Sequence, residues 1–274
     1  MMPTKARKLG ILAGGGELPR LLIDACQRTG RAVFVIAFKA QCDPETVEGV
    51  DHAWVGVGKA GKSIEHLKAN GVEELVMAGR IKKPSMAQLM PDVRTLKFFA
   101  SGVLNKGDDT LLSAIVQSLE SEEGFRMVGV QDVMPELLAP EGVLGSVTPS
   151  DADQGSIASA IHAALELGEK DLGQAAVAHE GRVVALEERA GTDAMLKSLI
   201  GNAQAKGAVL AKMLKPGQER RADLPTIGVA TIENAMLAGL SGVVVEAGAS
   251  LIINQNAVID AANAAGLFVV GVKP

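Results

Sequence analysis

Short apolar runs alternate with helical patterns along the first half of the chain, and this alternation limits the fold more than any other feature. The runs expected to form strands are residues 9–13, 32–37, 53–57, 75–78 and 127–130. The helices expected between them include one opened by Pro19 and others over residues 63–69 and 111–119. Strands that alternate with helices at this spacing form a parallel sheet with crossover connections. Residues 1–145 are therefore predicted to form a Rossmann-like domain.

A second α/β domain is predicted for residues 146–274. Prolines and glycines crowd residues 135–149, which are therefore the expected linker. Beyond it, a helix is expected over residues 151–167, and two strands meet at the turn Glu180-Gly181. The remaining elements expected are helices at 194–200 and 257–265 and strands at 175–178, 183–186, 209–213, 243–245, 251–253 and 268–270. The expected fold class is thus α/β with two domains, an N-terminal Rossmann-like parallel sheet and a C-terminal α/β domain.

Composition excludes several classes of function. Aromatic residues make up 3% of the 274 residues, too few for the stacking platforms that bind single-stranded nucleic acid, so no nucleic-acid partner is expected. The net charge of −5 gives no reason to expect a polyanionic partner over the whole surface. Cys26 and Cys42 are too few for a disulfide scaffold and fit a reducing compartment. Because no apolar run approaches the ~20 residues of a membrane span, we expect a cytoplasmic protein, at most peripheral to a membrane.

Two glycine-rich segments follow predicted strands. The run Gly14-Gly15-Gly16 lies between the first strand and the first helix, where the backbone can approach a ligand and the helix start offers N–H groups to phosphate; the alternative is a plain tight turn. Pro19 occupies the place of the third glycine of the dinucleotide fingerprint, which argues against a redox cofactor. Residues 56–63 match the phosphate-loop pattern of nucleotide triphosphatases. No acid ends the following strand to complete a metal site, so a glycine-rich turn with a solvated lysine is favoured there.

Charged residues mark two further places in the first half. Arg80, Lys82 and Lys83 follow the fourth strand at its carboxyl end, where ligands bind in open α/β sheets, although a solvated charge run explains them equally well. The segment Gly107-Asp108-Asp109 precedes an apolar helix, so a helix cap is the favoured interpretation there.

In the second half, acids and lysines lie close together along the chain. Glu187 ends a predicted strand and Asp193 begins a predicted helix. Lys212 and Lys215 shortly precede Asp223, with prolines and glycines between them. Lysines neutralise phosphate and a carboxylate can hold a divalent cation, so this pattern suits metal-assisted phosphate chemistry. Helix caps and surface ion pairs are the alternative explanation.

Taken in order, these segments resemble the LpxI-type UDP-2,3-diacylglucosamine pyrophosphatases. The segments that carry the resemblance are residues 13–19 (Ala-Gly-Gly-Gly-Glu-Leu-Pro), 78–84 (Ala-Gly-Arg-Ile-Lys-Lys-Pro), 107–109, 187–193, 215–217 and 223–231. The resemblance spans nearly the whole chain, and the run Asp223-Leu-Pro-Thr-Ile-Gly is its most specific part. It implies a two-domain fold with the active site in the cleft between the domains. It also implies Mg²⁺-dependent hydrolysis of UDP-2,3-diacylglucosamine to 2,3-diacylglucosamine 1-phosphate (lipid X) and UMP, a step of lipid A biosynthesis.

The resemblance also suggests roles for particular residues. Asp223 is the expected catalytic residue, which holds Mg²⁺ or orients the attacking water, because an ordinary ionised Asp is a better metal ligand than base. Lys215 is the second expected catalytic residue and would neutralise charge on the bridging phosphates. Asp193 and Glu187 are the other expected metal ligands. The residues expected to bind substrate are Gly14, Gly15, Gly16, Glu17, Arg80, Lys82, Thr192, Lys212 and Thr226.

Two other functions stay open on the sequence. A nucleotide triphosphatase would use residues 56–63 and would depend on Lys62. A non-catalytic nucleotide-sugar binding protein would bind a UDP-sugar and release no UMP. If the substrate is a lipid-linked UDP-sugar, transient contact with the cytoplasmic leaflet of the inner membrane is expected, and a homodimer is the assembly considered.

Overall fold

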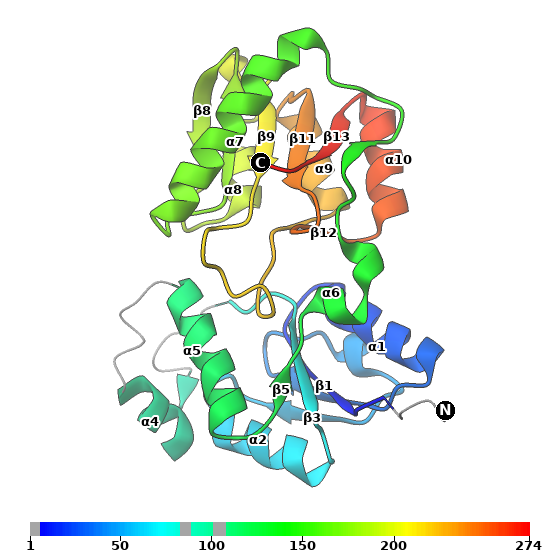
Figure 1. Ribbon diagram of the computed structural model, residues 1–274, viewed down its shortest axis with the longest axis vertical. Helices are drawn as coiled ribbons and strands as arrows, with labels where there is room; N and C mark the ends of the chain where they lie inside the picture. Colours follow the sequence, from blue (N-terminus) through cyan, green and yellow to red (C-terminus); the bar gives the residue numbers. More distant parts are fainter. Residues whose placement is uncertain (1–5, 83–88, 101–107) are drawn as a thin grey trace. The chain divides into compact units, whose positions relative to one another are not determined.

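The structure is a computed structural model that describes residues 6–82, 89–100 and 108–274. Contacts divide the chain into two compact units (Figure 1). The first unit runs to Pro135 and also includes Glu219–Asp223, while the second consists of Glu136–Gln218 and Leu224–Pro274. The division therefore falls earlier than the expected boundary at residue 145, and a short segment from the second half of the sequence belongs to the first unit.

The first unit contains a five-stranded parallel sheet in the order β3-β2-β1-β4-β5. Its strands are β1 (Leu9–Ala13), β2 (Val33–Phe38), β3 (His52–Val55), β4 (Glu74–Ala78) and β5 (Arg126–Met127). The helices are α1 (Leu18–Thr29), α2 (Ala60–Ala69), α4 (Val93–Ala100), α5 (Asp108–Ser121) and α6 (Val130–Val133), and a 3₁₀ turn follows β2 at Pro44–Val47. The parallel order of these strands confirms the predicted Rossmann-like sheet. The physical reason is that β-branched and aliphatic runs buried on both faces favour parallel strands covered by helices.

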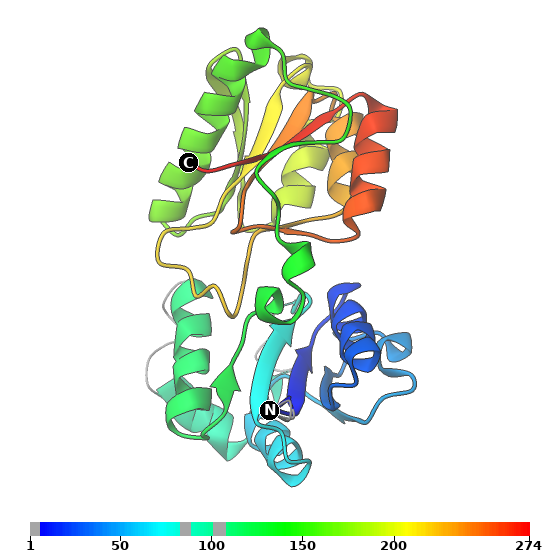
Figure 2. The ribbon, with the colours of Figure 1, turned by 45° about the vertical axis from the view of Figure 1, so that its right-hand side comes forward.

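One hydrophobic cluster joins the sheet of this unit to α2 and α5. It contains Phe34 and Ile36 from β2, Val55 from β3, Leu67 from α2, Leu75 from β4, Val116 from α5, Met127 from β5, and Phe125 just before β5. Ala222, from the segment that returns to this unit, packs against the same cluster. On α1, Leu22 and Ile23 are fully buried, and α1 also contacts α6 (Figure 2).

Two local expectations for the first unit need correction. The predicted strand over residues 127–130 is short, because β5 ends at Met127 and α6 begins at Val130. The Asp132 carboxylate accepts the Gly129 N–H at 2.8 Å and so caps the start of α6 directly after this strand. α4 was not predicted from the sequence; its start is capped by Asp92, which accepts the Thr95 N–H at 2.9 Å.

The second unit contains a six-stranded mixed sheet in the order β6-β13-β11-β9-β7-β8. Its strands are β6 (Gly142–Leu144), β7 (Ala175–His179), β8 (Arg182–Leu186), β9 (Val209–Lys212), β11 (Gly242–Glu246) and β13 (Phe268–Val272). β9, β11 and β13 are parallel, and β6, β7 and β8 add antiparallel edges. A separate two-stranded sheet pairs β10 (Thr226–Ile227) with β12 (Leu251–Ile252). The second α/β domain is thus confirmed.

Helices cover both faces of this sheet. α7 (Gln154–Glu169) packs on β7, β8 and β9, and its alanines Ala160, Ala163 and Ala164 are buried in one cluster. The other face is covered by α8 (Thr192–Ser198), α9 (Val229–Leu237) and α10 (Gln255–Ala265), which share the second cluster. The expected linker carries β6, because the backbone of residues 142–144 pairs with β13. Proline and glycine content alone did not reveal that strand, and α9 was also missed.

Candidate functional site

The order of strands in the first unit identifies the edge where a ligand is expected. The chain proceeds from β1 to β2 on one side, whereas β4 lies on the other side of β1. Crossover helices therefore leave the neighbouring carboxyl ends of β1 and β4 in opposite directions. In open α/β sheets, ligands bind in the crevice at this switch point. The glycine run after β1 and the basic residues after β4 both lie at this edge.

The loops after β1 and β4 are joined by backbone hydrogen bonds. Gly14 N–H donates to the Ala78 carbonyl at 2.8 Å, and Gly15 N–H donates to the Arg80 carbonyl at 2.9 Å. Arg80 N–H donates back to Gly15 at 2.9 Å. A Cβ at position 14 would lie 2.5 Å from the Arg80 carbonyl oxygen, so this position requires glycine. The close approach that the glycines allow is thus to the backbone of Arg80, and the amides of Gly14 and Gly15 are used within the protein.

The exposed part of this loop begins at Gly16. Gly16 has φ 91°, a left-handed conformation that favours glycine, and it and Glu17 are exposed. Glu17 is the N-cap residue of α1, next to the first free turn of the helix. Arg80 and Lys82 are also exposed. Several of the residues predicted to bind substrate therefore lie together at one sheet edge: the glycine run, Glu17, Arg80 and Lys82.

Gln41 is a residue of this edge that the sequence analysis missed. Its side-chain oxygen accepts the Lys82 N–H at 2.8 Å, and its amide nitrogen donates to the Lys82 carbonyl at 3.0 Å. A Cβ at Gly15 would also lie 2.7 Å from the Gln41 carbonyl oxygen. The loops after β1, β2 and β4 thus converge. The available signal was position alone, since Gln41 follows shortly after the second predicted strand. Lys83 and Gly107 lie outside the described residues, as do the side chains of Asp108 and Asp109.

An internal carboxylate binds the helix start that follows residues 56–58 in the segment matching the phosphate-loop pattern, residues 56–63. Asp92 accepts the Gly61 N–H at 2.8 Å through one oxygen and the Thr95 N–H at 2.9 Å through the other. A Cβ at Gly58 would lie 1.9 Å from the Leu89 carbonyl oxygen. In a phosphate loop, the amides at the helix start bind phosphate. Here Asp92, which the sequence analysis did not single out, occupies that position at the start of α2.

The charge of Asp92 is stabilised by these contacts. Burial alone would raise the pKa of its carboxyl group, but hydrogen bonds from Thr95, Gly61 and Lys62 outweigh burial and lower that pKa. Thr95 also donates its hydroxyl to Asp92 at 2.9 Å. Asp92 therefore acts as the built-in anion for two helix starts, those of α2 and α4.

In the second unit, Glu187 is buried and fully engaged. It is 7% exposed, and its two oxygens accept the Thr192 hydroxyl at 2.6 Å and the Gln174 N–H at 2.8 Å. These contacts tie the end of β8 to the start of α8 and to the segment before β7. Thr192, a predicted substrate-binding residue, is thus itself buried on Glu187. Asp193 lies in the first turn of α8, where a carboxylate is favoured by the helix dipole.

Lys212 and Thr226 are brought together within the second unit. Lys212 is 8% exposed at the end of β9, and its ammonium donates to the Thr226 carbonyl at 3.0 Å. Glu246, at the end of the neighbouring strand β11, accepts the Leu214 N–H at 3.0 Å. Glu246 was missed, although an acid directly after the apolar run 243–245 was a readable signal for a polar group at this sheet edge.

The two predicted catalytic residues fall in different units. Lys215, in the second, forms an ion pair with Asp171 at 2.8 Å, a partner that the sequence analysis did not identify. Asp223, in the first, is exposed, and its N–H donates to the Glu219 carbonyl at 3.1 Å. An exposed carboxylate does not bear the full free-energy cost of desolvation, so it can bind a solvated cation or lie close to a solvated phosphate.

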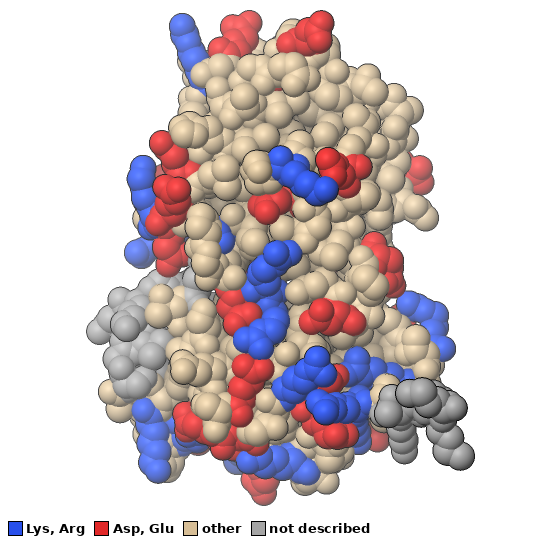
Figure 3. Space-filling model, in the orientation of Figure 1, with Lys and Arg blue, Asp and Glu red and all other residues tan. Residues whose placement is uncertain are grey.

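Charged side chains of both signs are mixed on the visible surface. On the face drawn in Figure 3, Lys and Arg side chains lie among Asp and Glu side chains and do not form a patch of one sign. This agrees with a net charge of −5 spread over 27 basic and 32 acidic residues. An anionic ligand would therefore be held by a few local groups, such as Arg80 and Lys82, more than by a long-range field.

Comparison with known proteins identifies the family. Models of the LpxI N-terminal domain and the LpxI C-terminal domain match residues 8–137 and 140–270. The UDP-2,3-diacylglucosamine pyrophosphatase LpxI of Caulobacter vibrioides is 44% identical over 277 residues, covering 98% of each chain. The chain therefore belongs to the LpxI family of two-domain α/β proteins.

Solved structures add little to this result. The structures "glycinamide-RNase-transformylase T from Mycobacterium tuberculosis" and "carboxyaminoimidazole ribonucleotide synthase from asperigillus clavatus complexed with ATP" are 14% and 17% identical to this chain. Each match covers 66% of this chain, with 44% and 39% of the other chains and TM-scores of 0.24. Similarity at this level carries no argument about fold or activity.

Proposed function

We propose that this protein hydrolyses the diphosphate of UDP-2,3-diacylglucosamine to 2,3-diacylglucosamine 1-phosphate and UMP, a step of lipid A biosynthesis. The observation that carries the proposal is the 44% identity to a relative of that name along 98% of both chains. In the reaction, a water oxygen forms a new bond to one phosphorus, and the bridging P–O bond of the anhydride breaks. The two protons of water end on the separated phosphate products and in solvent.

The residues of the switch-point edge would bind the anionic part of the substrate. Arg80 and Lys82 are exposed beside Gly16, at the carboxyl ends of β1 and β4. Guanidinium and ammonium groups pair with phosphate oxygens, and Arg does so through a planar fork. Gln41 supports this role, because its two hydrogen bonds to the Lys82 backbone fix the base of that side chain.

Asp223 is the proposed catalytic residue. Its exposure and its place in the most specific segment of the family resemblance support the assignment. As an ionised carboxylate it would orient the attacking water or share in holding a cation. Lys215 would neutralise charge as the anhydride bond breaks. Its ammonium lies on Asp171 at 2.8 Å, so it would exchange that partner for a phosphate oxygen.

Mg²⁺ is part of this proposal. Its site commonly uses one or two carboxylates together with substrate phosphates, and Asp223 and Asp193 are carboxylates suited to it. Glu187 fits less well, because both of its oxygens accept hydrogen bonds inside the second unit. When bound, Mg²⁺ would polarise the phosphate oxygens and lower the pKa of a bound water. Among the described residues no cluster of three His, Cys, Asp or Glu side chains is preformed for a metal, so substrate oxygens would complete the coordination.

The direct test is incubation with UDP-2,3-diacylglucosamine and Mg²⁺, with UMP release as the measurement. Asp223→Ala should reduce kcat by at least about 10³-fold, a loss in the range seen when a key catalytic group is removed, while circular dichroism stays native-like. Wild-type protein that binds the substrate without releasing UMP would instead support a non-catalytic nucleotide-sugar binding protein. Activity of Asp223→Ala within threefold of wild type would overturn the assignment to Asp223.

The rival nucleotide triphosphatase is tested by Lys62→Ala. In a genuine phosphate loop this lysine contacts the transferred phosphate, so its removal abolishes activity. Because Asp92 already occupies the amides at the start of α2, we expect Lys62→Ala to leave UMP release within twofold of wild type and the wild-type protein to show no ATP hydrolysis. A strong loss of activity in this variant would revive the rival.

We also propose transient contact with the cytoplasmic leaflet of the inner membrane, where a diacylated substrate lies. None of the described helices is long and apolar enough to cross a bilayer. On α4, Val93 and Leu96 are 70% and 52% exposed, and Met90, just before the helix, is 67% exposed; these apolar side chains support an interfacial contact. The double change Val93→Ser and Leu96→Ser should weaken sedimentation with anionic vesicles. Unchanged sedimentation would exclude α4 as the contact. The homodimer considered from the sequence stays a prediction, which light scattering tests separately.

A further inference from the structure

Five residues of the second half of the chain form an arm on the first unit. The arm is Glu219–Asp223, whose contacts group with the first unit although the residues before and after it belong to the second. Asp223, the proposed catalytic residue, is the last residue of the arm. The groups that hold the arm in place therefore decide where this carboxylate lies relative to the first unit.

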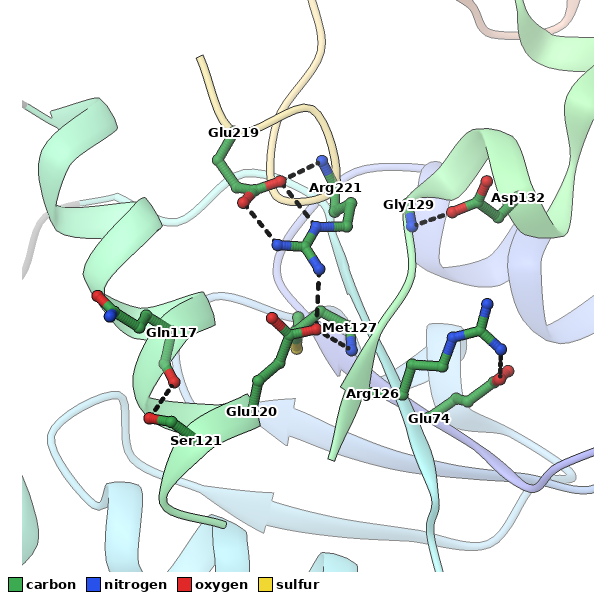
Figure 4. A network of polar contacts seen from close by, with 10 residues as sticks. All are labelled: Glu74, Gln117, Glu120, Ser121, Arg126, Met127, Gly129, Asp132, Glu219 and Arg221. Carbon is green, nitrogen blue, oxygen red and sulfur yellow. Dashed lines mark hydrogen bonds and ion pairs between the residues drawn. The ribbon is translucent and has the colours of Figure 1, made fainter. Parts of the chain in front are cut away.

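Arg221 is the centre of the contacts that hold the arm (Figure 4). Its Nε and Nη2 donate to the two oxygens of Glu219 at 2.9 and 2.8 Å. Its Nη1 donates to Glu120, on α5, at 2.8 Å. The Glu219 carboxylate raises the pKa of Arg221 further above its ordinary value, and Arg221 in turn lowers the pKa of Glu219. One guanidinium thus makes three charge-assisted hydrogen bonds: two hold the arm to itself through Glu219, and one joins it to α5 through Glu120.

The backbone transmits this anchorage to Asp223. The N–H groups of Ala222 and Asp223 both donate to the Glu219 carbonyl, at 2.9 and 3.1 Å. Gln131 donates its side-chain amide to the Arg220 carbonyl at 3.3 Å. The arm is therefore a tight turn. Its first residue, Glu219, is hydrogen-bonded to Arg221, and its last residue, Asp223, is hydrogen-bonded to Glu219.

Glu120 is itself tied to the sheet. Its Oε1, which accepts Arg221, also accepts the Met127 N–H of β5 at 3.2 Å. Side-chain exposures of 36% for Arg221 and 34% for Glu120 leave the pair in contact with water. The pair also borders two cavities of about 410 and 420 Å³. A solvent-accessible ion pair contributes little to folding stability, so stability alone does not explain why three such contacts converge on one guanidinium.

We infer that Glu120 and Arg221 are positioning residues, which present the carboxylate of Asp223 to the reacting diphosphate. This inference rests on the proposed function. Neither side chain needs to touch substrate, because each acts through the arm. A shift of about 1 Å in a catalytic group can cost on the order of 10²-fold in rate. Loss of the pair should therefore lower kcat much more than it changes stability or KM.

The test compares Glu120→Gln and Arg221→Lys with a matched control, Glu122→Gln. Glu122 is close to Glu120 in sequence and pairs with Arg94 at 2.8 Å, but it does not contact the arm. We expect the first two variants to lower kcat by roughly 10- to 100-fold with KM within threefold of wild type. Their thermal unfolding midpoints should stay within a few degrees of wild type, and the control should match wild type in both measurements.

Three outcomes separate the possible failures. Asp223→Ala that stays active refutes the proposed function of Asp223 and removes the basis of the inference. Asp223→Ala that is inactive, together with Glu120→Gln and Arg221→Lys within threefold of wild-type kcat, refutes the positioning role alone. An equal loss of kcat in Glu122→Gln would also refute it, because the effect would then follow any charge lost near the end of α5.

Discussion

Substituting Glu187 can distinguish a structural role of its carboxylate from a role as a metal ligand. In the second unit, Glu187 is 7% exposed and accepts hydrogen bonds from the Thr192 hydroxyl and the Gln174 N–H. Glu187→Ala would leave the part-buried Gln174 N–H without its acceptor and would free the buried Thr192 hydroxyl. A buried group that loses its partner costs about 1–3 kcal/mol, and hydrogen bonds to a charged acceptor lie at the upper end. We therefore expect a loss of about 2–4 kcal/mol in the free energy of unfolding.

Glu187→Gln is the matched control for this change. Its amide oxygen can still accept the Gln174 N–H, and its amide nitrogen can donate to the Thr192 hydroxyl oxygen. Both contacts are kept and only the charge is lost, so we expect a cost of about 1 kcal/mol. For a domain of this size, each 1 kcal/mol moves the unfolding midpoint by roughly 4 °C. Scanning calorimetry without divalent cations should then place Glu187→Ala about 8–16 °C below wild type, and Glu187→Gln about 4 °C below.

A different result would refute this reasoning. A carboxylate kept for a cation is an uncompensated charge in cation-free protein, so its removal would be neutral or stabilising. If Glu187→Ala is as stable as wild type without Mg²⁺ but no longer responds to Mg²⁺, Glu187 is a metal ligand, as the family resemblance suggests. If stability falls as expected and the Mg²⁺ dependence of activity is unchanged, its role is structural.

Two further predictions concern Asp92 and Lys215. Asp92→Ala removes the cap of two helices and should cost about 1–2 kcal/mol at pH 7. Because hydrogen bonds lower the pKa of Asp92 in the folded protein, this stabilisation is present above the ordinary value of 3.8 and is lost as pH falls through the lower folded pKa. Urea unfolding of wild type and Asp92→Ala at pH 7 and pH 3 measures this pH dependence. A stability difference that does not change with pH would contradict the prediction. Lys215→Ala should lower kcat by about 10-fold or more, whereas Asp171→Asn, which keeps the ammonium, should stay within threefold in the UMP assay. Equal losses in both would mean that the ion pair, and not the lysine, matters.

Local sequence pattern was enough to predict most of the elements. Short apolar runs predicted β1, β2, β4, β9, β11 and β13, and helical patterns predicted α1, α5, α7 and α10. The alternation of the two also predicted the parallel sheet, because few topologies can bury such strands on both faces. Short elements escaped, since β6 and β10 are stabilised by pairing with distant strands and carry little pattern of their own.

The sequence by itself determined the family, the two α/β units and the presence of glycine, lysine and acidic residues in the segments that define it. Only the tertiary structure decided which of these groups meet. It placed Arg80 against the glycine run, Asp92 on the phosphate-loop match, and Thr192 on Glu187. It also showed that Asp223 belongs to the first unit through the contacts of Arg221 with Glu120. The physical reason is that such contacts join residues far apart along the chain, whereas sequence patterns report only the preferences of near neighbours.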